Sequence, residues 1–272
     1  DTKAKEHAKI NGKKVAMFNT WDKRVESMEF QFRKLLNYDI KAELKKKYEK
    51  VDILFLAVID YDFRYQRPQH LAHSFSSQGH RVFYINANYN NEQTQTVKTI
   101  DNINVISIRS ERYSAIHIAD YTKESIDIIE EIESIVIDNC IRDCLIVVQY
   151  PTWIQAADYL KQKYGFKVIT DYLDDYTGFK DTNIKCLSSC CEKLLNNSDL
   201  VVASSNYLAE IASKYNSNIK IVRNGTEFNH FYKAYGKSLD NTKSRKIIGY
   251  YGAISHWFDF DKVVYLAKNL PD

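Results

Sequence analysis

From Val51 onwards, the sequence alternates short apolar runs with amphipathic stretches. Near-continuous apolar runs such as VDILFLAVI (residues 51–59) and LIVVQY (145–150) are typical of strands buried on both faces of a sheet. The stretches between such runs carry apolar residues at three- and four-residue spacing, which predicts helices. Regular alternation of this kind favours right-handed β-α-β units. We therefore predict an α/β fold with a Rossmann-like parallel sheet and helices on both faces.

The predicted elements can be listed in chain order. Strands are expected at 51–59, 81–87, 104–109, 145–150, 167–173, 199–205, 219–225 and 246–255, with a polar stretch before the third. The first helix is expected at 67–80, with Pro68 in its first turn and Gly79 at its exit. A second helix is expected to bury one face formed by Ile126, Ile129, Ile132, Val136 and Cys140, and a third begins at Pro151. The remaining helices are expected around Ile184, Leu187, Cys191 and Leu194, at 206–215 and at 258–269.

Residues 1–50 differ from the rest and predict a helical extension or linker. Met28, Phe32 and Leu35 recur at helical spacing and form one apolar stripe. A basic group follows, made of Lys41, Lys45, Lys46, Lys47 and Lys50. It is either a membrane-surface patch or, because Glu43 and Glu49 are interspersed, a solvated helix face. The charged first residues lack a signal-peptide core and an initiator Met, so we expect a segment of a longer protein.

Composition excludes several classes of protein. The 38 basic and 35 acidic residues give a net charge of +3, which lacks the strongly basic footprint of a nucleic-acid-binding protein. No apolar run approaches the roughly 20 residues of a membrane span. The five cysteines favour reduced thiols in a cytoplasm. Cys140, Cys144, Cys186 and Cys190 invite a four-thiolate metal reading, but their C-x-x-x-C spacing favours buried free thiols.

The loop after the first strand, IDYDFRYQRPQH, contains no glycine. A dinucleotide-binding fold would place G-x-G-x-x-G here, so NAD- and FAD-dependent enzymes are disfavoured and we predict no cofactor. Arg64 and Arg67 lie beside a helix start, where guanidinium groups and free N–H groups favour an anion. The alternative is that one or both arginines pair with Asp60 or Asp62.

Two later strand ends carry further candidates. Asp171, Asp174 and Asp175 in DYLDDYTGF are suited to binding sugar hydroxyls, acting as a base or holding a divalent metal. The alternative is helix capping and pairing with a nearby Lys or Arg. Trp153 in QYPTW is either a stacking platform for a sugar ring or a buried core residue. The seven histidines include no H-E-x-x-H motif, and Ser204–Ser205 lacks the setting of a nucleophile elbow.

Four stretches in order resemble the GT-B glycosyltransferases of the large retaining family 4. They are RPQHLAHSFSSQGHRVFYIN, CCEKLLNNSDLVVASSNYLAEIASKY, IKIVRNGTEFNHF and IIGYYGAISHWFDFDKVVYLA, and the similarity runs from about Val51 to the end. DYLDDYTGF is similar to a subgroup associated with cell-envelope polysaccharides. The resemblance implies two Rossmann-like domains facing across a cleft, with the acceptor on the first and a nucleotide-sugar donor on the second. It also implies transfer with retention and without a metal.

By position, the resemblance assigns three segments. They are an extension (1–50), an acceptor domain (51–225) and a crossing segment with the first β-α unit of a donor domain (226–272). It implies that Asn224 and Gly225 mark the crossing, and that Gly249 and Gly252 flank the donor-side loop. Arg64, Arg67, Trp153, Asp171, Asp174 and Asp175 are the candidates on the acceptor side.

The sequence also departs from the family. Tyr61–Tyr65 replaces the Gly-Gly pair that many members carry, and QYPTW has no counterpart of their acceptor-domain histidine. No catalytic residue is therefore assigned. The chain stops at Asp272, before the donor-binding basic residues and the E-x7-E-like carboxylates. We expect residues 1–272 alone to be inactive.

Three functions are compatible with these features. The first is a glycosyltransferase that moves a sugar from a nucleotide-sugar to a glycan or lipid-linked acceptor in polysaccharide biosynthesis. It would act in the cytoplasm, with contact to the inner face of the membrane left open. The second is a non-catalytic binding or scaffold module on a degenerate GT-B fold. The third is a GT-A-type transferase with a metal at the Asp cluster, which is disfavoured because D-Y-L-D-D is not D-x-D.

Overall fold

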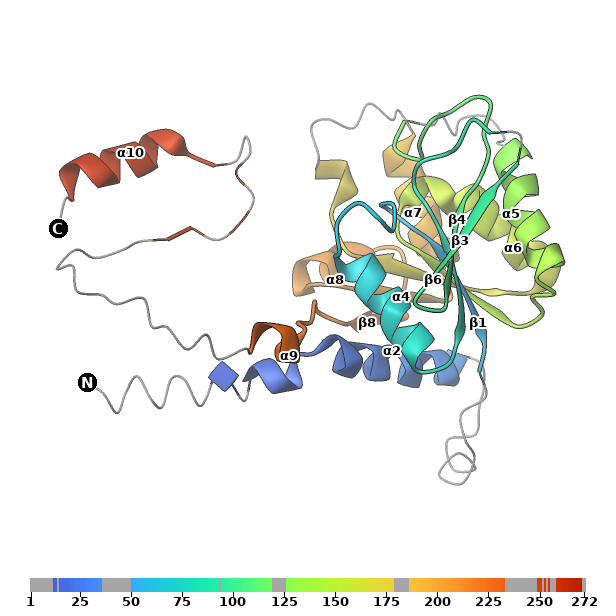
Figure 1. Ribbon diagram of the computed structural model, residues 1–272, viewed down its shortest axis with the longest axis horizontal. Helices are drawn as coiled ribbons and strands as arrows, with labels where there is room; N and C mark the ends of the chain where they lie inside the picture. The colour runs from blue at the N-terminus through green and yellow to red at the C-terminus, as the bar shows by residue number, and fades with distance from the viewer. Residues whose placement is uncertain are drawn as a thin grey trace, which may run out of the picture. The chain divides into compact units, whose positions relative to one another are not determined.

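Seven of the eight predicted strands lie in one sheet in the computed structural model of the chain (Figure 1). Within the described residues the sheet has eight strands in the order β3-β4-β2-β1-β5-β6-β7-β8. All neighbours are parallel except β3, which pairs antiparallel with β4. The strands are β1 (Asp52–Leu56), β2 (Arg81–Ile85), β3 (Thr96–Ile100), β4 (Ile103–Ser107), β5 (Cys144–Val148), β6 (Lys167–Tyr172), β7 (Leu200–Ala203) and β8 (Ile219–Ile221). The predicted α/β class is confirmed.

The structure describes residues 12–13, 15–35, 50–92, 94–118, 126–178, 186–232, 249–250, 252, 254 and 258–270. The chain divides into two compact units, unit 1 (Asp1–Phe228) and unit 2 (Asn229–Asp272). Unit 1 contains the whole sheet. Within the described residues of the chain, no helix has the length and apolarity needed to cross a membrane.

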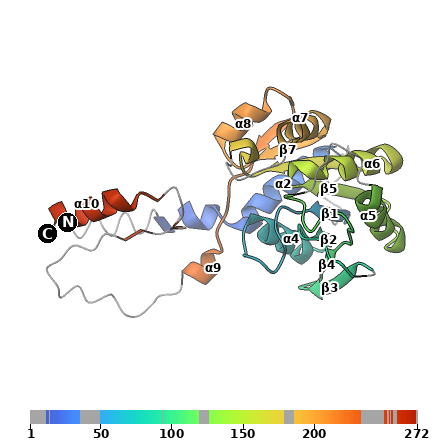
Figure 2. The same cartoon turned by 90° about the horizontal axis from the view of Figure 1, so that it is seen from above.

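Helices cover both faces of the sheet, as predicted (Figures 1 and 2). One core contains side chains of α2 (Trp21–Leu35) and α4 (Arg67–Ser77), and the other contains those of α5 (Ile126–Asp138), α6 (Ile154–Tyr164), α7 (Leu187–Asn197) and α8 (Asn206–Ala212). Short 3-10 turns η1 (Pro151–Trp153) and η2 (Tyr176–Gly178) follow β5 and β6. Central strands such as β5 are buried at every residue, which explains their continuous apolar sequence.

The boundaries of α4 follow its sequence signals. Pro68 lies in the first turn after the N-cap residue Gln66, and Gly79 leaves the helix at a φ of +93°. Glycine tolerates this left-handed conformation because it has no Cβ, so it ends the helix without strain.

Two predictions between β2 and β5 differ from the structure. Part of the polar stretch before β4 forms β3, whose central residues are exposed because it is the antiparallel edge strand. The buried face of α5 is Ile128, Ile132, Ile135 and Val136, whereas Ile126 and Cys140 are exposed. Ile126 begins the helix and Cys140 follows its end, so the predicted face extended too far in both directions.

The N-terminal extension contains the predicted helix and apolar stripe. Met28 and Phe32 of α2 are buried, together with Trp21 and Val25, and Leu35 packs against them. The stripe lies on the same core as α4, so α2 is an integral layer of unit 1. Of the predicted basic group, Lys50 is described, and its Nζ donates to the Gln78 carbonyl oxygen. Lys41, Lys45, Lys46 and Lys47 lie outside the described residues.

The cysteines are free thiols, as predicted. Cys144 opens β5, and it is buried together with Cys186, Cys190 and Cys191, whereas Cys140 is exposed. Within the described residues, no three His, Cys, Asp or Glu side chains are grouped as metal ligands.

In unit 2, α10 (Phe260–Asn269) confirms the predicted last helix and begins at an N-cap, where the Asp259 carboxylate accepts from the Lys262 amide. The segment α9 (Phe228–Phe231) lies at the boundary between the units. Most of the predicted strand at 246–255 lies outside the described residues, and so does Ile184, the first residue named for the predicted helix that corresponds to α7.

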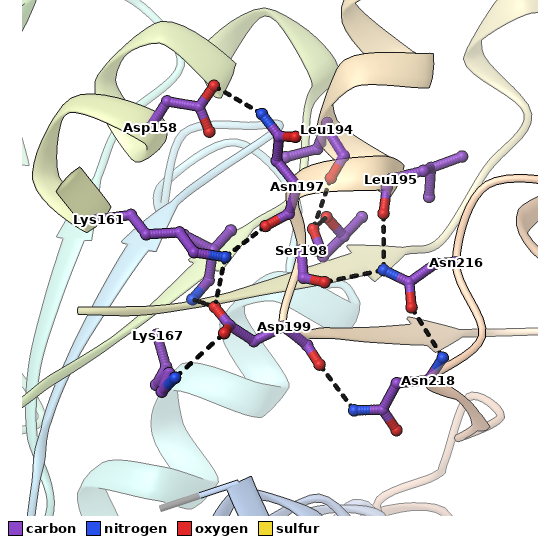
Figure 3. Close-up of polar contacts among 12 residues, drawn as sticks. Asp158, Lys161, Lys167, Leu194, Leu195, Asn197, Ser198, Asp199, Asn216 and Asn218 are labelled. Atoms are coloured by element: carbon purple, nitrogen blue, oxygen red, sulfur yellow. Dashed lines mark hydrogen bonds and ion pairs between the residues drawn. The ribbon is translucent and has the colours of Figure 1, made fainter. Parts of the chain in front are cut away.

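A polar network joins the helix ends at the amino edge of the sheet (Figure 3). Asp199, just before β7, accepts from the Val168 amide at 2.9 Å and lies 2.9 Å from Lys161 Nζ and 3.2 Å from Lys167 Nζ. The side-chain amide of Asn216 donates to the Leu195 and Ser198 carbonyl oxygens at 2.7 and 2.8 Å. Such bonds satisfy the carbonyl groups that a helix end leaves unpaired, so this edge stabilises the fold.

Replacing Asp199 should destabilise the protein in a pH-dependent way. Burial acts to raise the pKa of Asp199, but the bonds from Val168 and the two lysines outweigh it and lower the pKa. A lowered folded-state pKa means that the stabilisation is complete above the ordinary carboxyl pKa and is lost as pH falls below it. We expect Asp199→Asn to lower the free energy of unfolding by about 1–3 kcal/mol at pH 7 and by much less near pH 3, measured by urea denaturation. An equal loss at both pH values would contradict this.

Candidate functional site

The strand order defines where a ligand can bind. From β1 the chain continues to β2 on one side, and it later returns to place β5 on the other side. In open parallel sheets, such a change of direction leaves a crevice at the carboxyl ends of the two strands. Here that place is formed by the residues after Leu56 and Val148. The predicted site residues of unit 1 follow the carboxyl ends of strands, except Asp171, which is the second-last residue of β6.

Arg67, in the first turn of α4, is buried, and its guanidinium group donates hydrogen bonds to three other residues. Its Nε and Nη2 donate to the Asp171 carboxylate at distances of 2.7–3.1 Å, and its Nη1 donates to the Val222 carbonyl at 2.9 Å and to Asn224 Oδ1 at 3.2 Å. The two charged side chains are 4% and 0% exposed. Gln149 Nε2 also donates to Asp171, at 3.0 Å.

This network shows which of the predicted alternatives applies to Arg67 and Asp171, ligand binding or an ion pair within the protein. Both residues lie at the same edge of the sheet, as predicted, and they form an ion pair with each other. The partner of Arg67 is Asp171 and neither Asp60 nor Asp62. With 4% and 0% of their side chains exposed, both groups are buried among the protein's own atoms. Their role is to join β6, α4 and the segment after β8.

Arg64 differs from Arg67 in being exposed. Its guanidinium carbon lies 5.1 Å from the ring centre of Phe63, and Phe63 is itself 63% exposed. Asp60 accepts from the amide and the side chain of Asn88 at 2.8 and 2.7 Å, and Asp62 lies 3.9 Å from Lys98 Nζ. Arg64 therefore remains a candidate for contacting a ligand at this edge.

Asp174 and Asp175 extend beyond β6. Asp174 is exposed, and partial desolvation and then the charge of Asp171 raise its pKa. Asp175 accepts from Thr177 Oγ1 at 2.7 Å and from Tyr207 Oη at 3.3 Å. Of the three carboxylates, Asp174 is thus the one that combines exposure with a shifted pKa, which suits hydrogen bonding to a hydroxyl group or proton transfer.

Trp153 is a core residue, which contradicts its reading as a stacking platform. Its side chain is 1% exposed, and its Nε1 donates to the Ala57 carbonyl oxygen at 2.8 Å. The bond ties the turn after β5 to the end of β1. Burial satisfies both the apolar ring and its single donor, the usual requirement for a buried tryptophan.

Sequence analysis did not identify His117, a half-buried residue near the carboxyl ends of β1 and β5. Its ring centre lies 4.7 Å from that of Tyr150, at the end of β5. Tyr176 lies on Tyr150 in turn, at 5.0 Å, and donates to the Gln149 carbonyl at 2.6 Å. Burial lowers the pKa of His117, opposed by a hydrogen bond with the Val58 backbone and by the charge of Asp60. His117 belongs to no sequence motif, so its place near Tyr150 could be recognised only from the folded structure.

The loop that carries His117 is fixed at two strand ends. The Ile116 amide donates to the Ala87 carbonyl at 2.8 Å, after β2, and Thr152 Oγ1 donates to the Ile116 carbonyl at 3.2 Å, after β5. The His117 ring is therefore held at the crevice by backbone contacts on both sides.

The predicted crossing residues follow β8. Asn224 accepts from Arg67, and Gly225 lies against the backbone of α2, where an added Cβ would come within 2.7 Å of the Trp21 nitrogen. Gly249 and Gly252 belong to unit 2. The donor-side roles of these four residues stay predictions.

Comparison with known proteins leaves the family open. No protein-family model matches the chain, and no curated protein matches it significantly in sequence. Two structures of sucrose-phosphate synthase from Thermosynechococcus elongatus are similar to it. The first is 13% identical, covers 67% of this chain and 92% of its own, and has a TM-score of 0.46. The second is 14% identical, covers 65% of this chain and 49% of its own, and has a TM-score of 0.47. Likeness at this level says nothing about substrate or chemistry.

Removing one member of the buried ion pair should be strongly destabilising. Asp171→Ala leaves the Arg67 charge buried without its carboxylate, which typically costs about 3–5 kcal/mol. Asp62→Ala is the control, because the Asp62 side chain is 64% exposed, and it should change the free energy of unfolding by less than about 0.5 kcal/mol. Urea denaturation of both variants measures the difference. Equal stability of the two would show that the pair does not hold these elements together.

Proposed function

We propose that unit 1 is the acceptor-binding domain of a two-domain GT-B glycosyltransferase. The observation that carries the proposal is the strand order, which changes direction between β1 and β5, together with a second compact unit that begins at Asn229. The four stretches that resemble family 4 glycosyltransferases support it, because they fall on α4–β2, α7–β7–α8, β8 and α10 of this fold.

The loop after β1 supports a division of labour between two domains. Backbone amides approach a diphosphate closely only where side chains are missing, usually at glycines. Here Tyr61–Gln66 holds no glycine, and Phe63 and Tyr65 are bulky and exposed. Unit 1 is therefore poorly suited to hold the diphosphate of a nucleotide-sugar, and we infer that the donor is held by the domain to which unit 2 belongs.

The acceptor would then lie on the carboxyl edge of the sheet. Asp174 and the imidazole of His117 can hydrogen-bond a hydroxyl group, and Arg64 with the exposed Phe63 ring can contact an anionic or apolar part of a glycan or lipid-linked acceptor. Closing of two domains would exclude water and align the reacting hydroxyl. We further propose retention of configuration, independence of metal ions and a role in polysaccharide biosynthesis in the cytoplasm.

A non-catalytic scaffold is the second candidate. The burial of Arg67, Asp171 and Trp153 favours it, because three of the six acceptor-side candidates stabilise the fold rather than face a ligand. A scaffold would bind a glycan without consuming a nucleotide-sugar.

Transfer assays on the complete protein separate the two candidates. We expect nucleotide release from one member of a panel of nucleotide-sugars in the presence of cell-envelope glycans, with no change on adding a chelator. Glycan binding without nucleotide release would support the scaffold. Loss of activity with chelator, restored by manganese, would instead support a metal-dependent transferase.

Asp174→Asn should reduce this turnover by about tenfold to hundredfold, because the amide cannot accept a proton from the acceptor hydroxyl. The raised pKa of Asp174 means that wild-type activity should fall as pH decreases through that value, since only the ionised form accepts a proton. Asp138→Asn, an exposed change at the end of α5 on the opposite edge, is the matched control. Equal rates for the two variants would exclude Asp174 from the site.

A further inference from the structure

The chain leaves the sheet of unit 1 through residues 222–226, here called the exit segment. Its first residue, Val222, still donates to the Ala203 carbonyl of β7 at 2.9 Å. Arg67 then binds the segment from the side of α4, through the Val222 carbonyl at 2.9 Å and Asn224 Oδ1 at 3.2 Å. Because Arg67 is itself fixed by Asp171, this contact attaches the exit segment to the core.

A second set of contacts holds the exit segment from the N-terminal extension. The Thr226 amide donates to the Asn19 carbonyl at 2.9 Å, and Thr20 and Thr226 form a parallel bridge. Between these contacts, Gly225 approaches the extension so closely that a Cβ would lie 2.7 Å from Trp21 N and 2.8 Å from the Thr20 carbonyl carbon. Both of those atoms are backbone, so only a residue without a side chain fits at this approach.

The residues of the extension that make these contacts are themselves fixed. Trp21 is 7% exposed, and its ring stacks on His70 of α4 with centres 4.7 Å apart and planes 14° from parallel. The Arg67 guanidinium carbon lies 6.0 Å from the centre of the same ring. One helix, α4, therefore positions both groups that hold the exit segment.

We propose that Asn19–Trp21 and Arg67 form an exit clamp, which fixes residues 222–226 on unit 1 and confines any change of direction between the two units to residues after Thr226. The N-terminal extension then helps to hold the segment that leads from unit 1 to unit 2, and displacing the extension would release the exit segment. This inference does not rest on the proposed transferase, and a negative transfer assay would leave it standing.

Hydrogen exchange at single amides tests the clamp on residues 1–272. In the wild type, the Thr226 amide should exchange far more slowly than those of Phe231 and Tyr232, which are exposed and follow the clamp. Gly225→Ala should push the exit segment away from Trp21 and reduce the protection of Thr226 by about tenfold or more. Amides of β5 and β6 report whether the sheet stays intact.

The control variant is Gly178→Ala, where an added Cβ would meet only the Asp175 side chain, at an ordinary 3.6 Å. It should leave the protection of Thr226 unchanged. Trypsin gives an independent reading, since Arg223 is exposed but held within the exit segment, and it should be cut faster in Gly225→Ala than in the control.

Two results would overturn the proposal. One is a Thr226 amide that exchanges in the wild type as fast as Tyr232. The other is a Gly225→Ala protein with an intact sheet and unchanged Thr226 protection. If Gly225→Ala loses the sheet as well, Trp21→Ala replaces it, because removing the ring frees the extension without a clash in the exit segment, and the same loss at Thr226 is expected.

Discussion

The buried ion pair between Arg67 and Asp171 is the interaction on which the arrangement of unit 1 depends most. A guanidinium and a carboxylate with almost no exposed surface are tolerable only if nearly every donor finds a partner. Arg67, in the first turn of α4, meets this condition by binding β6 and the exit segment, through Asp171 and Asn224, which follow it by 104 and 157 residues in the chain. Because the two charged groups bind each other, they are not available to a ligand, but they hold β6, α4 and the exit segment together. The crevice and the exit clamp both border on this meeting point.

The sheet also explains why function should be sought on one edge. At the amino edge, Lys161 pairs with Asp199, and Asn216 donates to carbonyl oxygens at the end of α7, so these groups stabilise the fold. At the carboxyl edge, groups such as Arg64 and Asp174 remain exposed. The absence of glycine in the loop after β1 separates this edge from a dinucleotide site on a similar sheet. A ligand other than a diphosphate fits that difference best.

The sequence predicted the parallel strands well because a strand buried on both faces must be apolar throughout, as in β1 and β5. It missed β3, since an exposed edge strand such as TVKTI has no such requirement. It named Arg67 and Asp171 but not their bond, because a pairing across 104 residues leaves no local pattern. From sequence, Trp153 was compatible with both a sugar-stacking role and a core position, because the sequence does not show that its indole nitrogen donates to the Ala57 carbonyl oxygen. His117 had no sequence signal, because its position comes from a loop that is held at the ends of two strands, β2 and β5.

The shifted pKa values at the carboxyl edge have a common physical cause. Burial raises the pKa of Asp174 and lowers that of His117, and it raises the pKa of Tyr150 between them in the chain to about 12. Each shift is towards the neutral form, which means that this edge penalises charge more than water does. The same edge carries the glycine-free loop after β1. Both features are compatible with the proposed binding of acceptor hydroxyl groups at this edge, where the exposed Arg64 still offers a positive charge.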